Sequence, residues 1–169
     1  MNAKPALLTL GLYLMAMTLA GSAPRTSWFE ARTTGARTIT MSGTAEFGDG
    51  APGEAQTPFV ISLGAQSSAG AVILTRPGGG RLEPGVYPLE VDGPPSLQAL
   101  VVTGSPTQPT GAFHARTGVL TITRSQDDLI EGRFDIDAVG FEASDPGDEG
   151  KELVVRGTFI ASPGRQPAP

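Results

Sequence analysis

Apolar and polar residues alternate with a period of two over much of this chain, which is the pattern of β-strands. Residues 38–47 give the clearest example. Ile39, Met41, Gly43, Ala45 and Phe47 share one face, and threonine, serine and glutamate side chains occupy the other. A strand with one apolar and one polar face is typical of an antiparallel sheet that is covered on one side.

The same reasoning predicts further strands along the chain. Between them lie turns rich in glycine and proline, such as Asp49-Gly50 and Gly78-Gly79-Gly80. No segment beyond the N-terminal region has a helical pattern. We therefore expect an all-β domain, a single antiparallel β-barrel or β-sandwich of about eight to nine strands. The additional strands are expected at residues 59–65, 70–76, 86–91, 97–103, 119–124, 130–138 and 153–161, with a short strand or strand edge at 113–116.

Three of these strands carry a glycine between apolar residues on the inward face. The motif occurs at residues 41–45, 130–134 and 155–159. A glycine inside a strand weakens it, so its presence requires a structural reason. We expect either that an aromatic ring from a neighbouring strand lies over the bare backbone, or that the sheet coils there.

The N-terminal region has the layout of a secretory signal peptide. Lys4 precedes an apolar run at residues 6–20, and the small residues Gly21, Ser22 and Ala23 follow. The run of about 15 residues is shorter than the roughly 20 that cross a bilayer. We expect a signal peptide at residues 1–22 and a protein exported to the periplasm or the cell exterior. The alternative is an uncleaved membrane anchor.

The rest of the chain divides into three parts by composition. Residues 23–37, which include Trp28 and Phe29, form a polar lead-in. Residues 38–161 form the all-β domain. Residues 162–169 are rich in proline and are expected to be a disordered tail.

Composition excludes several classes of protein. The 23 glycines and 15 prolines among 169 residues disfavour long helices, and no collagen period is present. The absence of cysteine excludes disulfides, thiolate metal sites and cysteine nucleophiles. A net charge of −5 argues against nucleic acid and against anionic membrane surfaces as partners. The mature chain has no segment long enough to span a membrane, and we expect no cofactor.

Candidate catalytic residues are few. The sequence has neither a phosphate-binding loop nor the G-x-S-x-G motif of a nucleophile elbow. His114 is the single possible imidazole base, and no serine or acid accompanies it in sequence. Asp135 and Asp137 leave one face of a strand about 6.5–7 Å apart, a spacing that carboxylate hydrolases use. Arg133 on the same face indicates ordinary charge pairing instead.

Two acidic loops raise the question of calcium. One spans residues 145–150 and the other contains Asp127, Asp128 and Glu131. Neither has the ligand spacing of a calcium-binding loop, and calcium requires six to eight oxygen ligands. We therefore interpret both as solvated turns and expect no metal site.

Four short motifs resemble those of a loose group of exported bacterial β domains. They are Gly85-Val86-Tyr87-Pro88-Leu89, the segment 118–123, the segment 131–136 and Arg156-Gly157-Thr158-Phe159. The group comprises uncharacterised lipocalin-like secreted proteins and lipoproteins, and the resemblance covers residues 38–161. It implies a lipocalin-like barrel and brings no catalytic residues. The lipoprotein members carry a lipidated cysteine, which this chain lacks.

These observations predict a non-catalytic domain that binds a small apolar molecule or an envelope protein. Small barrels enclose one ligand, and five inward aromatic residues would line such a space. They are Phe47, Phe59, Tyr87, Phe134 and Phe159. The same residues would instead fill a solid core, an arrangement that the small number of aromatic residues favours. The alternatives are a structural or interaction module with a filled core, in which Trp28 and Phe29 form an exposed apolar patch, and, least favoured, a carboxylate-dependent hydrolase.

Overall fold

A computed structural model describes residues 26–48, 58–65, 70–89, 97–105, 108–144 and 150–164, and every regular element in these residues is a β-strand. The prediction of an all-β domain is therefore confirmed. The strands are β1 (Trp28–Gly35), β2 (Thr40–Gly48), β3 (Phe59–Ala65), β4 (Gly70–Arg76), β5 (Gly85–Pro88), β6 (Gln98–Ser105), β7 (Gln108–Gln126), β8 (Leu129–Glu142) and β9 (Lys151–Pro163).

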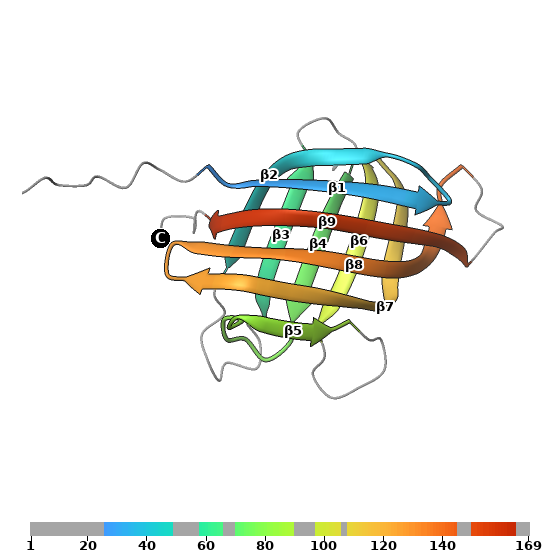
Figure 1. The fold of residues 1–169 in the computed structure, drawn as a ribbon. Helices are drawn as coiled ribbons and strands as arrows, with labels where there is room; N and C mark the ends of the chain where they lie inside the picture. The colour runs from blue at the N-terminus through green and yellow to red at the C-terminus, as the bar shows by residue number, and fades with distance from the viewer. Residues whose placement is uncertain are drawn as a thin grey trace, which may run out of the picture.

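Eight of the strands form a closed antiparallel barrel. Their order is β7-β6-β4-β3-β2-β1-β9-β8, and pairing of β8 with β7 closes the ring (Figure 1). Strand β5 is added outside the ring, where its four residues pair with Val119–Ile122 of β7. The structure thus decides between the two predicted architectures in favour of the barrel.

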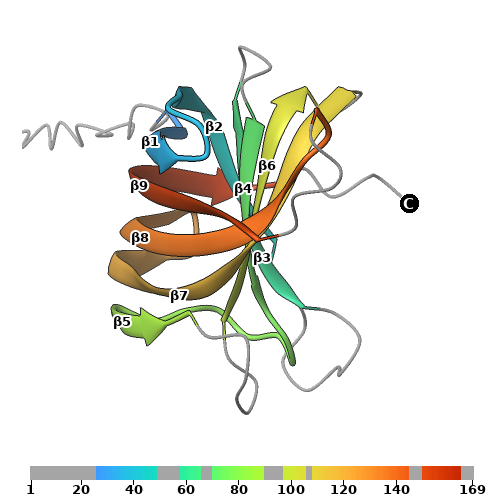
Figure 2. The same cartoon turned by 90° about the vertical axis from the view of Figure 1, so that its right-hand side faces the viewer.

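The barrel is flattened into two layers of strands that cross each other. In Figure 1, β1, β9, β8, the later part of β7 and β5 lie side by side in front, and β3, β4 and β6 cross behind them. Strand β2 first runs beside β1 and then turns into the back layer, where it pairs with β3. Strands β7 and β8 curve from one layer into the other (Figure 2). Two irregularities in the β7–β8 register, at Ala115/Thr117 and Ile122/Arg124, accompany this bend, as β-bulges do.

Strand boundaries differ from the predictions mainly at the start of the domain. Strand β1 lies inside the segment 23–37, so the interpretation of that segment as a lead-in is wrong. Residues 113–116 and 119–124, predicted as separate, belong to the single strand β7. Strand β9 continues to Pro163, two residues into the predicted tail. The predicted signal peptide lies outside the described residues.

The apolar alternation did not predict strand β1, because the inward face of this strand contains a polar residue, Thr33. Phe29, Ala31 and Thr33 are all buried. The Thr33 hydroxyl donates to the carbonyl of Arg37 (2.8 Å) and accepts from the amide of Ile39 (3.0 Å). These bonds satisfy the buried hydroxyl and tie β1 to the turn that leads into β2.

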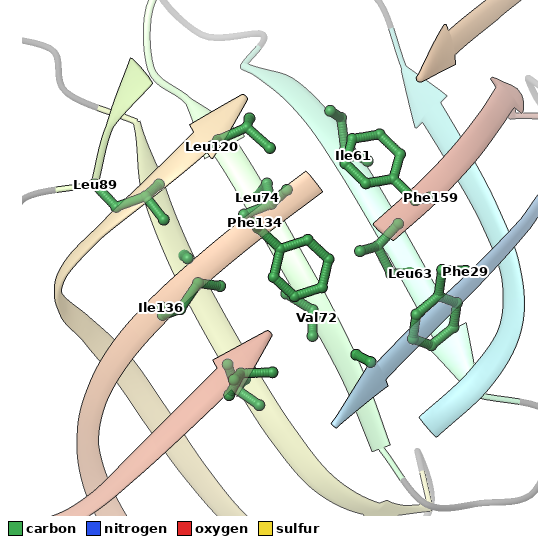
Figure 3. Packing of buried hydrophobic residues seen from close by; sticks show 14 of the residues in the cluster. Phe29, Ile61, Leu63, Val72, Leu74, Leu89, Leu120, Phe134, Ile136 and Phe159 are labelled. Carbon is green, nitrogen blue, oxygen red and sulfur yellow. The ribbon is translucent and has the colours of Figure 1, made fainter. Parts of the chain in front are cut away.

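The interior is filled by aliphatic and aromatic side chains from both layers (Figure 3). Burial alternates along the strands as predicted, so that Met41, Ala45 and Phe47 of β2 point inward. Each large apolar side chain that is withdrawn from water stabilises the fold by about 1.5–3 kcal/mol. The largest fully buried side chains are Phe29, Phe59, Phe113, Phe159, Met41, Ile61, Leu63, Leu74, Leu82, Leu89, Leu120 and Ile122.

On strands β8 and β9, an aromatic residue of each strand lies opposite a glycine of the other. Phe134 of β8 lies opposite Gly157 of β9, and Phe159 of β9 lies opposite Gly132 of β8. A Cβ atom on Gly157 would be 2.5 Å from Phe134 Cζ, and one on Gly132 would be 2.9 Å from Phe159 Cζ. The expectation that aromatic rings cover strand glycines is confirmed for this pair of strands.

The link between β4 and β5 covers one end of the barrel. Leu82 is inserted into the core, and the Arg81 guanidinium lies 4.9 Å from the centre of the Phe47 ring. Gly78, Gly79 and Gly80 all have φ between 68° and 84°, which only glycine adopts readily. The segment connects β4 to β5, two strands that do not pair with each other.

Charged and hydroxyl groups close the opposite end. Glu142 is 7% exposed and lies 2.5 Å from Arg37 Nε and 3.7 Å from Lys151 Nζ. Its buried Oε1 is balanced by the charge of Arg37 rather than by a directed hydrogen bond. Arg37 also donates to the Thr110 hydroxyl, which is 3.1 Å from that of Thr103.

The packing of aromatic rings over glycines predicts that one methyl group added at Gly157 destabilises the fold. We expect Gly157→Ala to lower the free energy of unfolding by about 1–3 kcal/mol, because the new Cβ would meet Phe134, Ala31 and the Glu30 carbonyl within 2.8 Å. Urea denaturation measures the change. Gly64→Ala in β3 is the control, since nothing lies within 4 Å of its Cβ position. Equal stability of both variants would contradict the packing described.

The burial of the Glu142 carboxylate predicts a difference in stability between two glutamate variants. Glu142→Ala removes the partner of Arg37 and Lys151, and we expect a loss of about 1–3 kcal/mol in the free energy of unfolding. Glu152→Ala removes an exposed ion pair with Arg116, so its effect should be below about 1 kcal/mol. Thermal and urea unfolding of the two variants would test this, and a larger loss for Glu152→Ala would refute it.

Candidate functional site

The five aromatic residues predicted to bind a ligand belong to the packed core. Phe47 and Phe59 form one pair, with ring centres 6.3 Å apart. Phe134 and Phe159 form another, at 6.4 Å, and these four side chains are at most 3% exposed. Tyr87 packs against the core from β5, and its hydroxyl donates to the Glu83 carbonyl at 2.7 Å. The rings of Phe134 and Phe159 also cover the glycine backbone of the neighbouring strand, as core residues do.

A groove lies instead on the outer face of the front layer. It has a volume of about 810 Å³ and is largely open to solvent. Four strands that are neighbours in the barrel, β1, β9, β8 and β7, build it. Its lining residues are Glu30, Ala31, Arg32, Gly118, Val119, Thr121, Arg133, Phe134, Asp135, Asp137, Arg156, Gly157 and Thr158.

The antiparallel register arranges the outward side chains of this groove in two rows across the strands. Directly paired residues have Cβ atoms about 4.5–5.5 Å apart. The first row reads Glu30, Thr158, Arg133 and Thr121 from β1 to β7. The second row reads Arg32, Arg156, Asp135 and Val119.

Glycine backbone forms part of the floor. Gly157 lies between Arg156 and Thr158, and Gly118 lies beside Val119. Neither position has room for a side chain, because a Cβ on Gly118 would be 2.5 Å from the Asp135 carbonyl oxygen. Because glycine has no side chain, main-chain atoms line the groove at these two positions.

One ion pair crosses the centre of the groove. Arg156 Nε donates to Asp135 Oδ2 at 2.8 Å. This hydrogen bond, the charge of Asp135 and, more weakly, the charge of Asp137 raise the pKa of Arg156 above its ordinary value. Arg156 therefore keeps its charge throughout the physiological pH range. Asp137 accepts a 3.4 Å hydrogen bond from the Thr117 hydroxyl.

Two arginines of the groove have no such partner. Among the described residues, Arg32 and Arg133 form neither an ion pair nor a side-chain hydrogen bond. Every other described arginine or lysine holds at least one. Both of the described cations that lack a partner thus lie in this groove.

The predicted catalytic candidates separate in space. Asp135 and Asp137 share the groove, but Asp135 is committed to Arg156, a residue that arrives from β9. The charge pairing expected on this face exists, with Arg156 in place of Arg133. His114 is exposed on the outer face of β7, and its cross-strand neighbours are Leu100 and Val139. It takes no part in the groove.

Metal binding finds no support in the described part of the chain. No group of three histidine, aspartate or glutamate side chains is gathered there. Asp127 lies 3.4 Å from Arg81, and Glu131 lies 3.9 Å from Arg124, so both pair with arginines. Residues 145–149 of the other acidic loop lie outside the described residues.

The predicted apolar patch at the N-terminal side is half correct. Trp28 is 40% exposed, whereas Phe29 is buried at 1%. Trp28 lies on the same outer face as Glu30 and Arg32, at the start of β1. Sequence reasoning missed Glu30 and Arg32 as site residues, although their alternation with Phe29 and Ala31 is the signal that would have identified this strand.

Comparison of the chain with protein-family models, with curated proteins and with solved structures finds no match. Within the residues that the structure describes, no helix has the length and apolar character needed to cross a membrane.

The packing of the interior predicts how the protein responds to an apolar probe. We expect cis-parinaric acid, a fluorescent fatty acid, to show no saturable binding, because the rings that would line a cavity contact each other and backbone. Fluorescence titration measures this, with a fatty-acid-binding barrel protein as the positive control. A saturable signal that unlabelled fatty acid displaces would refute the prediction.

Proposed function

We propose that this protein is an exported, non-catalytic binding domain that recognises a polar segment of a partner protein through its outer groove. The observation that carries the proposal is the coincidence of the groove with the two unpaired arginines, Arg32 and Arg133. A groove of this size that presents charges, hydroxyls and bare backbone offers many polar contacts.

The packed interior supports an outer binding surface. Barrels that carry apolar ligands need an internal cavity. Here the aromatic residues pack in pairs, Leu82 is inserted at one end, and the Glu142 cluster closes the other. A filled core favours the interaction module over the carrier of a small apolar molecule.

The shape and charge of the groove favour a protein segment over a small molecule. The groove is largely open to solvent and extends over four strands, about 14 Å from β1 to β7 at the usual strand spacing. It presents three arginines and three carboxylates, so both charge signs and the hydroxyls of Thr121 and Thr158 meet the partner. An extended peptide supplies groups of all these kinds along one chain.

Export rests on the signal-peptide pattern of residues 1–22 and on the resemblance to exported lipocalin-like β domains. Both support a partner in the envelope or outside the cell. An enzyme is disfavoured, since Asp135 holds an arginine and His114 lies among apolar neighbours.

A blocked groove tests the proposal. Heptapeptides from a random phage-displayed library would be selected on the wild-type protein and then measured against Thr158→Trp and Ser62→Trp. Thr158 is exposed in the groove, and Ser62 is exposed on β3 in the other layer. We expect the selected peptides to bind Thr158→Trp at least about tenfold more weakly, equivalent to about 1.4 kcal/mol, and Ser62→Trp unchanged.

Circular dichroism and thermal unfolding establish that both variants remain folded. Peptides that bind all three proteins equally would place recognition elsewhere and overturn the proposal. A library that yields no binder would also overturn it, because the groove would then not recognise peptides.

A further inference from the structure

We infer that Arg32 and Arg133 are the anion-binding residues of the groove, and that its ligand is a bipolar segment carrying carboxylate and cationic groups together. This inference rests on the proposed function and specifies the chemistry of its partner. It follows from which charges in the groove are already neutralised and which are not.

The surroundings of Arg133 show that its charge is available. Its cross-strand neighbours are Thr158 and Thr121, which are uncharged. The acids two positions away on β8 are Glu131, which pairs with Arg124 at 3.9 Å, and Asp135, which pairs with Arg156 at 2.8 Å. Both carboxylates near Arg133 are thus engaged by other arginines.

Arg32 has a still less favourable environment. Its neighbours across the two adjacent strands are Thr40 of β2 and Arg156 of β9. Like charges directly opposite each other in an antiparallel pair are destabilising. Asp135 relieves this repulsion only for Arg156. An anionic group from outside would supply Arg32 with the partner that the fold does not.

The guanidinium groups suit a carboxylate ligand. Arginine presents a planar fork of donors that binds a carboxylate through two parallel hydrogen bonds. Arg32 and Arg133 lie on different strands and in different rows of the groove, so they flank its centre from two sides.

The acids of the groove exclude a purely anionic ligand. Glu30, Asp135 and Asp137 balance the three arginines, so the groove has no net charge. Glu30 has no cationic partner among the described residues, and its cross-strand neighbours are Ser42 and Thr158. A polyanion would meet these carboxylates at close range, whereas a bipolar segment places its cation beside Glu30 or Asp137 and its carboxylate on the arginines.

Three blocked tripeptides test this charge requirement. They are acetyl-Glu-Gly-Lys-amide, which is bipolar, acetyl-Glu-Gly-Glu-amide and acetyl-Lys-Gly-Lys-amide. Titration into ¹⁵N-labelled protein at low salt follows the backbone amides of Gly157 and Thr158 and the Nε–H groups of the arginines. We expect the bipolar peptide to bind about two- to fivefold more tightly than either of the others, the range that one exposed ion pair supports.

Arginine variants assign the binding groups. We expect Arg32→Gln and Arg133→Gln each to weaken the bipolar peptide about two- to fivefold, and the double variant about tenfold. Arg116→Gln is the control, because Arg116 is an exposed arginine of β7 that pairs with Glu152 at 3.0 Å and does not line the groove. It should leave the affinity within about twofold of the wild type.

The outcomes separate this inference from the proposed function. Binding at Gly157 and Thr158 that is indifferent to both arginine variants, or equal for the three tripeptides, overturns the inference and leaves the groove as a binding site. Absence of binding by all three tripeptides also overturns the inference. The proposed function fails if the unbiased library yields no binder, or if its peptides bind regardless of the Thr158→Trp block.

Discussion

The structure depends on two reciprocal contacts between β8 and β9, in each of which an aromatic ring packs over a glycine of the other strand. Phe134 covers Gly157, and Phe159 covers Gly132, with ring centres 6.4 Å apart. Each ring fills the space that the opposite residue leaves empty, so two glycines that would weaken isolated strands instead fix the register. The same stretch of β9 then carries Arg156, Gly157 and Thr158 into the groove. The packing inside the barrel therefore sets the positions of the charges outside it.

The two ends of the barrel are closed by different physical means, and both closures favour the proposed binding at the outer face. At one end, Leu82 enters the core and Arg81 lies over the ring of Phe47. At the other end, Glu142 forms ion pairs with Arg37 and Lys151, whose positive charges offset the cost of burying its carboxylate. A ligand entering the interior would have to displace one of these arrangements. A partner on the outer face displaces only water.

The sequence predicted the fold class and most strands, because alternation of apolar residues is a local property. It failed for β1, because the inward face of this strand includes the polar residue Thr33 and its outward face includes the apolar residue Trp28. Closure of the barrel by β7 and β8 is a long-range pairing that no local pattern specifies. The candidate site likewise combines features that local sequence predicts with features that depend on long-range pairing. The common face of Arg133, Asp135 and Asp137 was predictable, but the partner of Asp135 comes from β9, and its identity depends on a register that only the fold sets.

The neutral charge of the groove accords with the proposed recognition of a bipolar partner by an acidic protein. A surface with one charge sign attracts any oppositely charged molecule, and its affinity reflects charge rather than sequence. A groove in which Arg32 and Arg133 stand beside Glu30 and Asp137 penalises ligands of either single sign. Exposed ion pairs contribute little affinity each, so discrimination arises from the mismatched charges that a wrong ligand places together. The packed core supplies the rigid sheet on which such a pattern of charges keeps its spacing.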